Sequence, residues 1–303
     1  MAYRLRRDLS VQESLVKVAR EQVDKAVREV RDHQRDRHEV VHQVRKRCKK
    51  LRGLVRLVRP EFEEYQKENE FFRDAARRLS YVRDAQSILE CFDGLTGRFQ
   101  EEGCLDEYAS IRQRLVDRRQ EVIDDQTGLE ARLEEFLKRM EEARPRLEKW
   151  RIAADGFAGV EGGLRKTYRR GRAALHKAYA KPTPDNFHEW RKRAKYHWYH
   201  LRLLRRIWPR VVASHVDAAD DLGSLLGDAH DLAVLRRTLL AEPGTFGTER
   251  DVRACLEVID RRCFELRSKA RPLGERIFAE KPKRLSARFH AYWDTWRRRG
   301  TEM

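Results

Sequence analysis

The sequence predicts an all-α protein, and three observations support this prediction. Apolar residues recur at helical spacing between residues 40 and 58, where Val44, Cys48, Leu51 and Val55 follow one another every three or four positions. No segment of four or more residues alternates cleanly between apolar and polar side chains, which is the pattern of a half-buried strand. Glycine and proline number only 16 and 8 among 303 residues, and they cluster where helices are expected to end.

Two of the expected helices resemble each other. Residues 41–47, VHQVRKR, align with residues 187–193, FHEWRKR, at an offset of 146 that pairs His42 with His188. Both segments continue to a proline, which cannot extend a helix: Pro60 in the first and Pro209 in the second. Residues 80–85, SYVRDA, match residues 224–229, SLLGDA, at an offset of 144. Two matches in the same order at nearly the same spacing indicate an internal duplication with pseudo-twofold symmetry.

A glycine-rich segment divides the chain almost equally. Residues 152–163, IAADGFAGVEGG, follow a long charged helix that is expected to end near Trp150. This composition is typical of a linker. The sequence therefore predicts a first helical-bundle half over residues 1–151, a linker over residues 152–163 and a second helical-bundle half over residues 164–303.

The chain carries a large positive charge, with 67 Lys and Arg against 50 Asp and Glu, a formal net charge of +17. Charged residues make up 39% of the chain, against about 25% in an ordinary globular domain. This excess of cations indicates a polyanionic partner, which can be nucleic acid, an anionic membrane or a phosphate polymer. The sequence has no long apolar run, no secretory leader and no CxxC pair, so we expect a cytoplasmic protein without a membrane span or a zinc site.

Cations on both duplicated helices form a narrow stripe beside the core-facing residues. At 100° per residue the first stripe falls within an arc of about 80°. The first stripe consists of His42, Arg45, Lys49, Arg52 and Arg56, and the second of His188, Arg191, Lys195 and Arg202, with Trp198 in the place of Arg52. Like charges at this spacing repel each other by about 0.2–0.5 kcal/mol per pair. A bound anion is therefore expected to neutralise the two stripes.

These motifs resemble those of the CHAD family, the conserved-histidine α-helical domain. The resemblance runs from about residue 10 to residue 298 and rests on residues 42–52, on residues 168–175 with 187–195, and on the tract 226–235, LGDAHDLAVL. It implies two four-helix bundles related by a pseudo-twofold axis around a basic central channel that binds inorganic polyphosphate. The contacts that it implies are His42, Arg45, Lys49, Lys50, Arg52, Arg169, Arg172, His188, Arg191, Lys192 and Lys195, with Arg83 as a weaker candidate.

The residues alone leave two other functions open. The pair His230-Asp231 is typical of metal-dependent phosphohydrolases, with His188 and His215 as candidate further ligands, although the first half has Gln86-Ser87 at this place. The aromatic segment 196–200, YHWYH, favours stacking on nucleic-acid bases, although helical periodicity turns His197 toward the core.

The sequence therefore predicts a non-enzymatic protein that binds inorganic polyphosphate and has no catalytic residue, metal or cofactor. Polyphosphate granules and their proteins are expected partners, a membrane is not, and nucleic acid is the alternative partner. Because Trp198 replaces a cation, the second half is expected to bind somewhat more weakly at that position.

Overall fold

The computed structural model describes residues 3–97, 108–242 and 244–298, and these residues form eleven α-helices and one 3₁₀ helix without any strand. The all-α prediction is therefore confirmed. The elements are α1 (Val11–Arg31), α2 (Arg37–Leu57), α3 (Tyr65–Arg77), α4 (Ser80–Thr96), α5 (Ala109–Asp124), α6 (Gln126–Leu147), α7 (Ala158–Ala180), α8 (Pro184–Leu204), η3 (Arg205–Ile207), α9 (Pro209–Ala241), α10 (Glu249–Ile277) and α11 (Pro282–Arg298).

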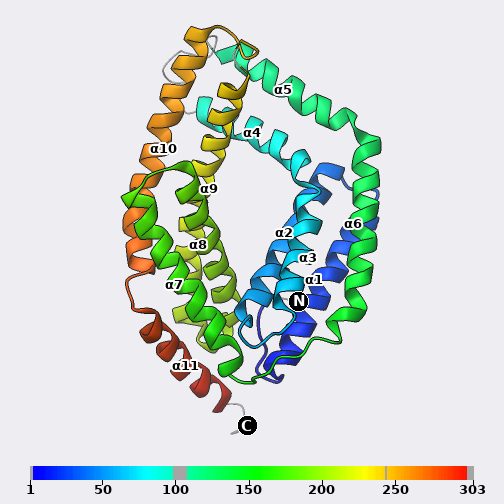
Figure 1. Cartoon of the computed structure of the whole chain (residues 1–303), viewed down its shortest axis with the longest axis vertical. Helices are drawn as coiled ribbons and strands as arrows, with labels where there is room; N and C mark the ends of the chain where they lie inside the picture. Colours follow the sequence, from blue (N-terminus) through cyan, green and yellow to red (C-terminus); the bar gives the residue numbers. More distant parts are fainter. Residues whose placement is uncertain (1–2, 98–107, 243, 299–303) are drawn as a thin grey trace.

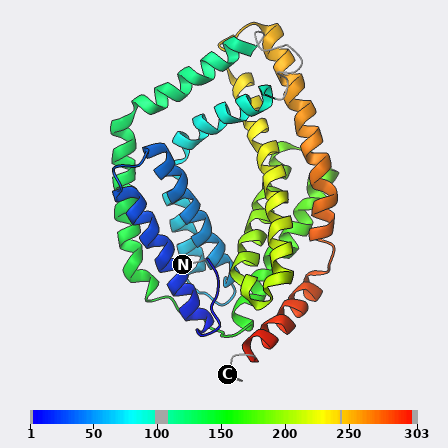
Figure 2. The ribbon, with the colours of Figure 1, turned by 180° about the vertical axis from the view of Figure 1, so that it is seen from behind.

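The helices trace a closed ring in Figures 1 and 2. Helices α1, α2, α3 and α6 form one side, and α7 to α10 form the other. At one end α4 crosses to pack on α9, and α5 packs on α4 and leads back to α6. At the other end α2 packs on both α7 and α8. The duplicated helices α2 and α8 therefore meet at one end of the ring and diverge toward their N termini (Figure 1).

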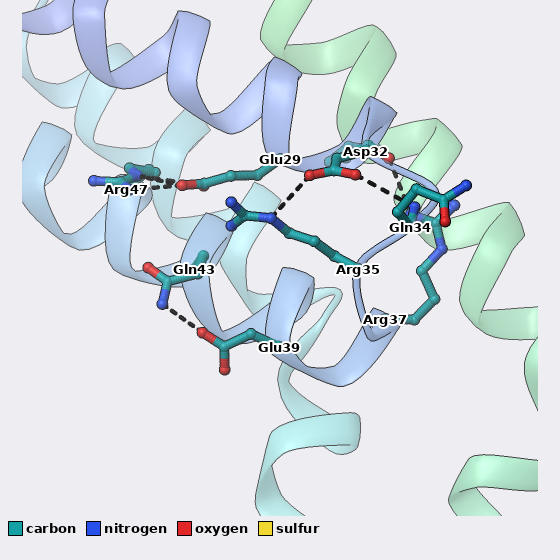
Figure 3. Close-up of polar contacts among 9 residues, drawn as sticks. Glu29, Asp32, Gln34, Arg35, Arg37, Glu39, Gln43 and Arg47 are labelled. Carbon is teal, nitrogen blue, oxygen red and sulfur yellow. Dashed lines mark hydrogen bonds and ion pairs between the residues drawn. The ribbon is translucent and has the colours of Figure 1, made fainter.

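The ends of α1 and α2 are set by side chains that bond to free backbone groups. Ser10 caps α1 and forms a reciprocal capping box with Glu13, and the side chain of Asp36 accepts a hydrogen bond from the first turn of α2. Figure 3 shows the hairpin between the two helices, where Arg47 of α2 pairs with Glu29 of α1 at 2.6 Å. The positive charge of Arg47 is therefore neutralised within the protein.

Two apolar cores hold the ring together. The larger core is formed by α1, α2, α3, α6, α7, α8, α11, the first part of α9 and the last part of α10. The smaller core is formed by α4, α5, the second part of α9 and the first part of α10. Each core takes residues from both predicted halves of the sequence. The halves therefore pack into shared cores, and the division of the chain into two bundle halves stays a prediction.

Glycines in the predicted linker have a different role from the expected one. Helix α7 begins at Ala158, so residues 158–163 are helical and only the first half of the predicted linker connects helices. A Cβ atom on Gly163 would overlap with the backbone carbonyl of Leu57, and one on Gly162 would lie 2.7 Å from Pro60. The linker over 152–163 was thus too long, because these two glycines permit the close approach of α7 to the end of α2.

Helices α2 and α8 touch at positions that correspond in the predicted duplication. A Cβ atom on Gly53 would lie 2.8 Å from Cβ of Tyr199, and the two residue numbers differ by the same 146 that relates the two histidine motifs. Nε2 of His200 lies 3.1 Å from the carbonyl oxygen of Gly53. This arrangement is the one expected if a pseudo-twofold axis passes between the two helices, which remains a prediction for the chain as a whole.

No helix within the described residues is long and apolar enough to cross a membrane.

Replacing Gly163 with alanine should destabilise the protein, because α7 must move away from the α2 backbone. We expect the free energy of unfolding to fall by about 1–3 kcal/mol, measured by urea denaturation. Gly94 is the matched control, because it lies on an exposed part of α4 and a Cβ atom there would have no other atom within 4 Å. Gly94→Ala should leave stability unchanged or raise it by about 0.5–1 kcal/mol. Equal stability of the two variants would contradict the close packing of α7 on α2.

The free energy of unfolding should also fall as the pH is lowered through the ordinary pKa range of histidine. Burial lowers the pKa of His197 to about 3 and that of His200 well below its usual value, with Arg59 as the next influence on His200. The unfolded chain binds protons near a pKa of about 6.5, whereas the folded chain does not, so this contribution is complete above that pH and is lost below it. The expected loss is about 1.4 kcal/mol per pH unit for each histidine.

Urea denaturation at about pH 7.5 and pH 5.5 measures this dependence. The exposed His176 provides the control, because His176→Asn should leave the pH dependence unchanged, whereas His200→Gln should reduce it. Equal free energies of unfolding at the two pH values would show that the buried histidines do not titrate as proposed.

Candidate functional site

The α2 stripe lies along the side of the helix that borders α3 and α8. Lys49 is exposed, and His42, Arg45 and Arg52 are half-buried. Nη1 of Arg45 donates to the carbonyl oxygen of Ala76 near the C-terminal end of α3, at 3.2 Å. Nε of Arg52 donates to the side chain of Asn69, also on α3, at 3.4 Å. These contacts fix two arginines of the stripe against α3.

The α8 stripe lies against two glycines of α9. A Cβ atom on Gly223 would lie 2.6 Å from Cδ of Lys195, and one on Gly227 would lie 3.6 Å from Nε of Arg191. The long side chains of Arg191 and Lys195 therefore lie across a strip of α9 that has no side chains. Nε of Arg191 is buried and has no hydrogen-bond partner among residues 3–97, 108–242 and 244–298, and Nζ of Lys195 lies 3.2 Å from Asp220.

His188 of α8 is paired with His230 of α9. Their Nδ1 atoms lie 3.1 Å apart, and their ring centroids are 4.2 Å apart. Burial lowers the pKa of both histidines, that of His230 to about 3, and Arg191 lowers both further. At neutral pH the two rings are therefore uncharged, and the Nδ1–H of one ring donates to the Nδ1 of the other.

The remaining predicted residues occupy different surroundings. Lys192 is exposed and forms a surface ion pair with Glu189 at 2.5 Å, a geometry that contributes little to stability.

The other predicted contacts lie on α7, α2 and α4. Arg169 is exposed and Arg172 is half-buried, both on α7. Lys50 is buried on the flank of α2 away from Arg52 and Arg56. Arg83 lies on α4, and its side chain falls outside the described part of the structure.

Aromatic side chains hold cations where α2 meets α8. The guanidinium of Arg56 lies 4.2 Å from the ring centroid of Tyr196, and that of Arg52 lies 5.9 Å from the same ring. Trp198 lies between Nζ of Lys195, at 4.1 Å, and the guanidinium of Arg202, at 4.5 Å. Trp198 therefore positions two cations in the place where the first stripe has Arg52, a contribution that its apolar character did not indicate.

A compact group of cations lies at the junction of α2, α7 and α8. This junction cluster consists of Arg52, Arg56, Arg59, Lys166 and Arg170. Arg56 and Arg59 are only 9% and 8% exposed, and the Nε atom of each is buried without a hydrogen-bond partner in the part of the chain that the structure describes. Nη2 of Arg59 donates to Thr167 of α7 at 3.1 Å, which ties the end of α2 to α7.

The charges of the junction cluster act on one another. Burial lowers the pKa of Arg59 to about 10, and Arg170 and Arg56 add to this effect. The pKa of Lys166 is lowered chiefly by Arg59, then by burial and Arg170. No carboxylate is among the main influences on the pKa of Arg52, Arg59 or Lys166 within the described residues. The cluster therefore concentrates positive charge in a partly desolvated place without internal compensation.

Several cations elsewhere in the chain pair with carboxylates. Arg47 of α2 pairs with Glu29 (Figure 3), Arg37 of α2 pairs with Glu130 at 2.6 Å, and Arg146 pairs with the buried Glu68 at 3.0 Å. The chain thus has carboxylates available for pairing but places them away from the junction cluster. An external anion is the remaining group that can neutralise this cluster.

The sequence predicted part of the junction cluster. Arg52 and Arg56 belong to the first stripe, although only Arg52 was among the implied contacts. Arg59, Lys166 and Arg170 were missed: Arg59 follows the end of α2, and the α7 residues adjoin the predicted Arg169. The glycines at 162 and 163 were the available signal, because a helix with two adjacent glycines can approach another backbone closely.

The two alternative sites have limited support in the structure. No group of three or more His, Cys, Asp or Glu side chains with metal-binding geometry occurs among the described residues. In the aromatic segment, His197, Tyr199 and His200 are buried, as the helical periodicity indicated for His197. Only Tyr196 and Trp198 of that segment are partly exposed, and both already contact cations.

Comparisons with known proteins agree with the geometry. The fold is similar to that of PptA from Streptomyces chartreusis, with a TM-score of 0.62 and 12% sequence identity over 89% of this chain and 99% of that chain. A comparison with curated proteins gave no match. A family model described as the CHAD domain matches residues 17–240, which is well over half of the chain. The protein belongs to the CHAD domain family.

Proposed function

We propose that this protein binds inorganic polyphosphate without transforming it. The cations of α2, α7 and α8 form the binding surface, and the residues implied by the family motifs line a basic channel between the two sides of the ring. Polyphosphate binding is the known association of the family. Binding takes place in the cytoplasm, where the protein associates with polyphosphate granules.

The observation that carries the proposal is the uncompensated charge of the junction cluster. Arg56 and Arg59 are more than nine-tenths buried, and each presents an unpartnered Nε. A guanidinium fork matches the oxygens of a phosphate group, and such charge-assisted bonds are about twice as strong as neutral ones. Phosphate oxygens therefore supply both the charge and the acceptors that the cluster lacks.

The length of the two stripes favours a polymer over a single small anion. Residues 42 to 56 of α2 span roughly 21 Å along the helix axis. Arg191 and Lys195 extend the same kind of surface along α8. A linear chain with a negative charge on every unit can contact successive cations on both helices. Each phosphate that is neutralised in this way releases the counterions bound to it.

Polyphosphate fits the site better than nucleic acid because the site can form mainly electrostatic contacts. Base recognition needs exposed aromatic faces or base-edge contacts, whereas most of the aromatic segment 196–200 is buried. The polar groups of the proposed binding surface are guanidinium and ammonium groups, which bind phosphate oxygens by charge and hydrogen-bond geometry.

Calorimetric titration at physiological salt, without metal, tests the proposal. Long-chain polyphosphate should bind tightly, and single-stranded RNA of matched charge should bind weakly. Unchanged polyphosphate recovered after binding would support binding without turnover. Equal or tighter binding of RNA would reject polyphosphate as the specific ligand and point to Tyr196 and Trp198 as the stacking surface.

Removing one buried cation should raise stability while weakening binding. Arg56→Met keeps the apolar volume beside Tyr196 but removes a charge that has no carboxylate partner among the described residues, so the free energy of unfolding should rise by about 1 kcal/mol. The same change should weaken polyphosphate binding by about tenfold or more and lower the slope of log K against log salt by about 0.7.

Arg28→Met removes an exposed cation of α1 and serves as the control for charge alone. It should change neither stability nor affinity appreciably. Lower stability of Arg56→Met, with affinity equal to that of the control, would show that Arg56 has a structural role and not a binding role.

A further inference from the structure

A second concentration of positive charge lies on the other side of the contact between α2 and α8. A cavity of about 430 Å³, here called the Tyr3 pocket, is formed by the N-terminal segment, α1, α2, α8 and η3. Its lining carries six cations and no carboxylate: Arg4, Lys25, Lys50, Arg202, Arg205 and Arg206. None of Arg4, Lys25, Arg205 and Arg206 belongs to either stripe or to the junction cluster.

The buried lysine of this pocket, Lys50, has cations as its main charged neighbours in the described part of the chain. Lys50 is only 8% exposed, and burial lowers its pKa to about 8, with Arg47 and Arg202 adding to the effect. Its Nζ lies 6.0 Å from the ring centroid of Tyr3, and no carboxylate pairs with it among the residues that the structure describes. A lysine in this position remains charged near neutral pH most readily when an anion enters the pocket.

The pocket is built by ordered contacts and is not an accidental hollow. The hydroxyl of Tyr3 donates to the carbonyl oxygen of Lys50 at 2.8 Å. The backbone N–H of Leu5 donates to the carbonyl oxygen of Leu203 at 2.9 Å. The guanidinium of Arg202 lies 5.6 Å from the Tyr3 ring centroid. The N-terminal segment is therefore fixed to both α2 and α8, and it closes one wall of the pocket.

The Tyr3 pocket and the junction cluster flank the same helix contact. At 100° per residue, Lys50 lies about 60° to one side of Gly53 on α2, and Arg56 lies about 60° to the other side. The contacts agree, because Arg56 lies over Tyr196 whereas Lys50 and Arg202 both lie near Tyr3. The direct contact of Gly53 with Tyr199 separates the two groups of cations.

Two lysines connect the groups on the side where the helices diverge. Lys49 and Lys195 each stand one turn before the contacting residues, Gly53 on α2 and Tyr199 on α8. The helices separate from this point toward their N termini (Figure 1). A polymer that passes from one group of cations to the other on this side meets both lysines.

We propose that the Tyr3 pocket is a second anchoring site for the polyphosphate chain that occupies the junction cluster. One polymer is then held on both sides of the α2–α8 contact, with Lys49 and Lys195 between the two anchors. This inference rests on the proposed function. Because the second anchor binds intramolecularly once the first is occupied, affinity rises steeply when the polymer is long enough to reach both.

Titrations with inorganic tripolyphosphate and with long-chain polyphosphate test the inference. Wild-type protein should bind two tripolyphosphate molecules but only one long chain. Lys50→Gln with Arg205→Gln should remove one tripolyphosphate site and weaken long-chain binding by about tenfold or more. Arg56→Gln with Arg59→Gln should remove the other tripolyphosphate site. Arg210→Gln with Lys283→Gln, two exposed cations outside the pocket, should change neither.

The outcomes separate the inference from the function on which it rests. The proposal would be overturned if Lys50→Gln with Arg205→Gln lost one tripolyphosphate site but bound long-chain polyphosphate as tightly as the wild type. The pocket would then bind small phosphates independently of the polymer. Two tripolyphosphate sites retained in this variant would overturn it as well. Absence of any polyphosphate binding by the wild-type protein would reject the proposed function itself.

Discussion

The close approach of α2 to α7 and α8 is the constraint on which the rest of the site depends. Gly163 lets the α7 backbone approach the end of α2, and Gly53 lets α2 touch Tyr199 of α8. Larger side chains at either glycine would separate these helices. The same contacts bring Arg56 and Arg59 of the first half beside residues of the second half. The charge density of the site is thus a consequence of backbone packing.

The distribution of carboxylates explains why this charge is available to a ligand. The chain has 50 acidic residues, and many of them pair with cations on the outer surfaces, as Glu29 does with Arg47 (Figure 3). Among the described residues, Arg59 of the junction cluster and Lys50 of the Tyr3 pocket have cations and tyrosines as their main neighbours instead. Burying such groups together is unfavourable in the absence of an anion. A polyanion that binds only the folded chain therefore stabilises it through the same residues.

The sequence predicted the helices and the faces of the stripes, because the spacing of apolar residues determines which side of a helix faces the core. It predicted less well which elements meet. The sequence predicts a linker that includes Gly162 and Gly163, since glycine marks both flexible segments and close helix contacts, and only the tertiary structure distinguishes the two. Lys50 was grouped with its neighbours in the chain, although its flank of α2 faces a different pocket.

Residues of the site that come from irregular or distant segments could not be predicted from periodicity. Arg59 follows the last turn of α2, and Tyr3 and Arg4 precede α1. Their contribution arises from the way in which the chain folds back on α7 and α8, which no local pattern encodes. The role of Trp198, which lies between Lys195 and Arg202, likewise depends on rotamers and on neighbours one turn away.

A crystal structure of the protein with bound long-chain polyphosphate tests the central claim most directly. The account predicts phosphate oxygens within hydrogen-bonding distance, about 2.7–3.2 Å, of the Nε atoms of Arg56 and Arg59. Polymer density confined to other surfaces, with both Nε atoms still lacking an acceptor, would contradict the assignment of the junction cluster as the binding site.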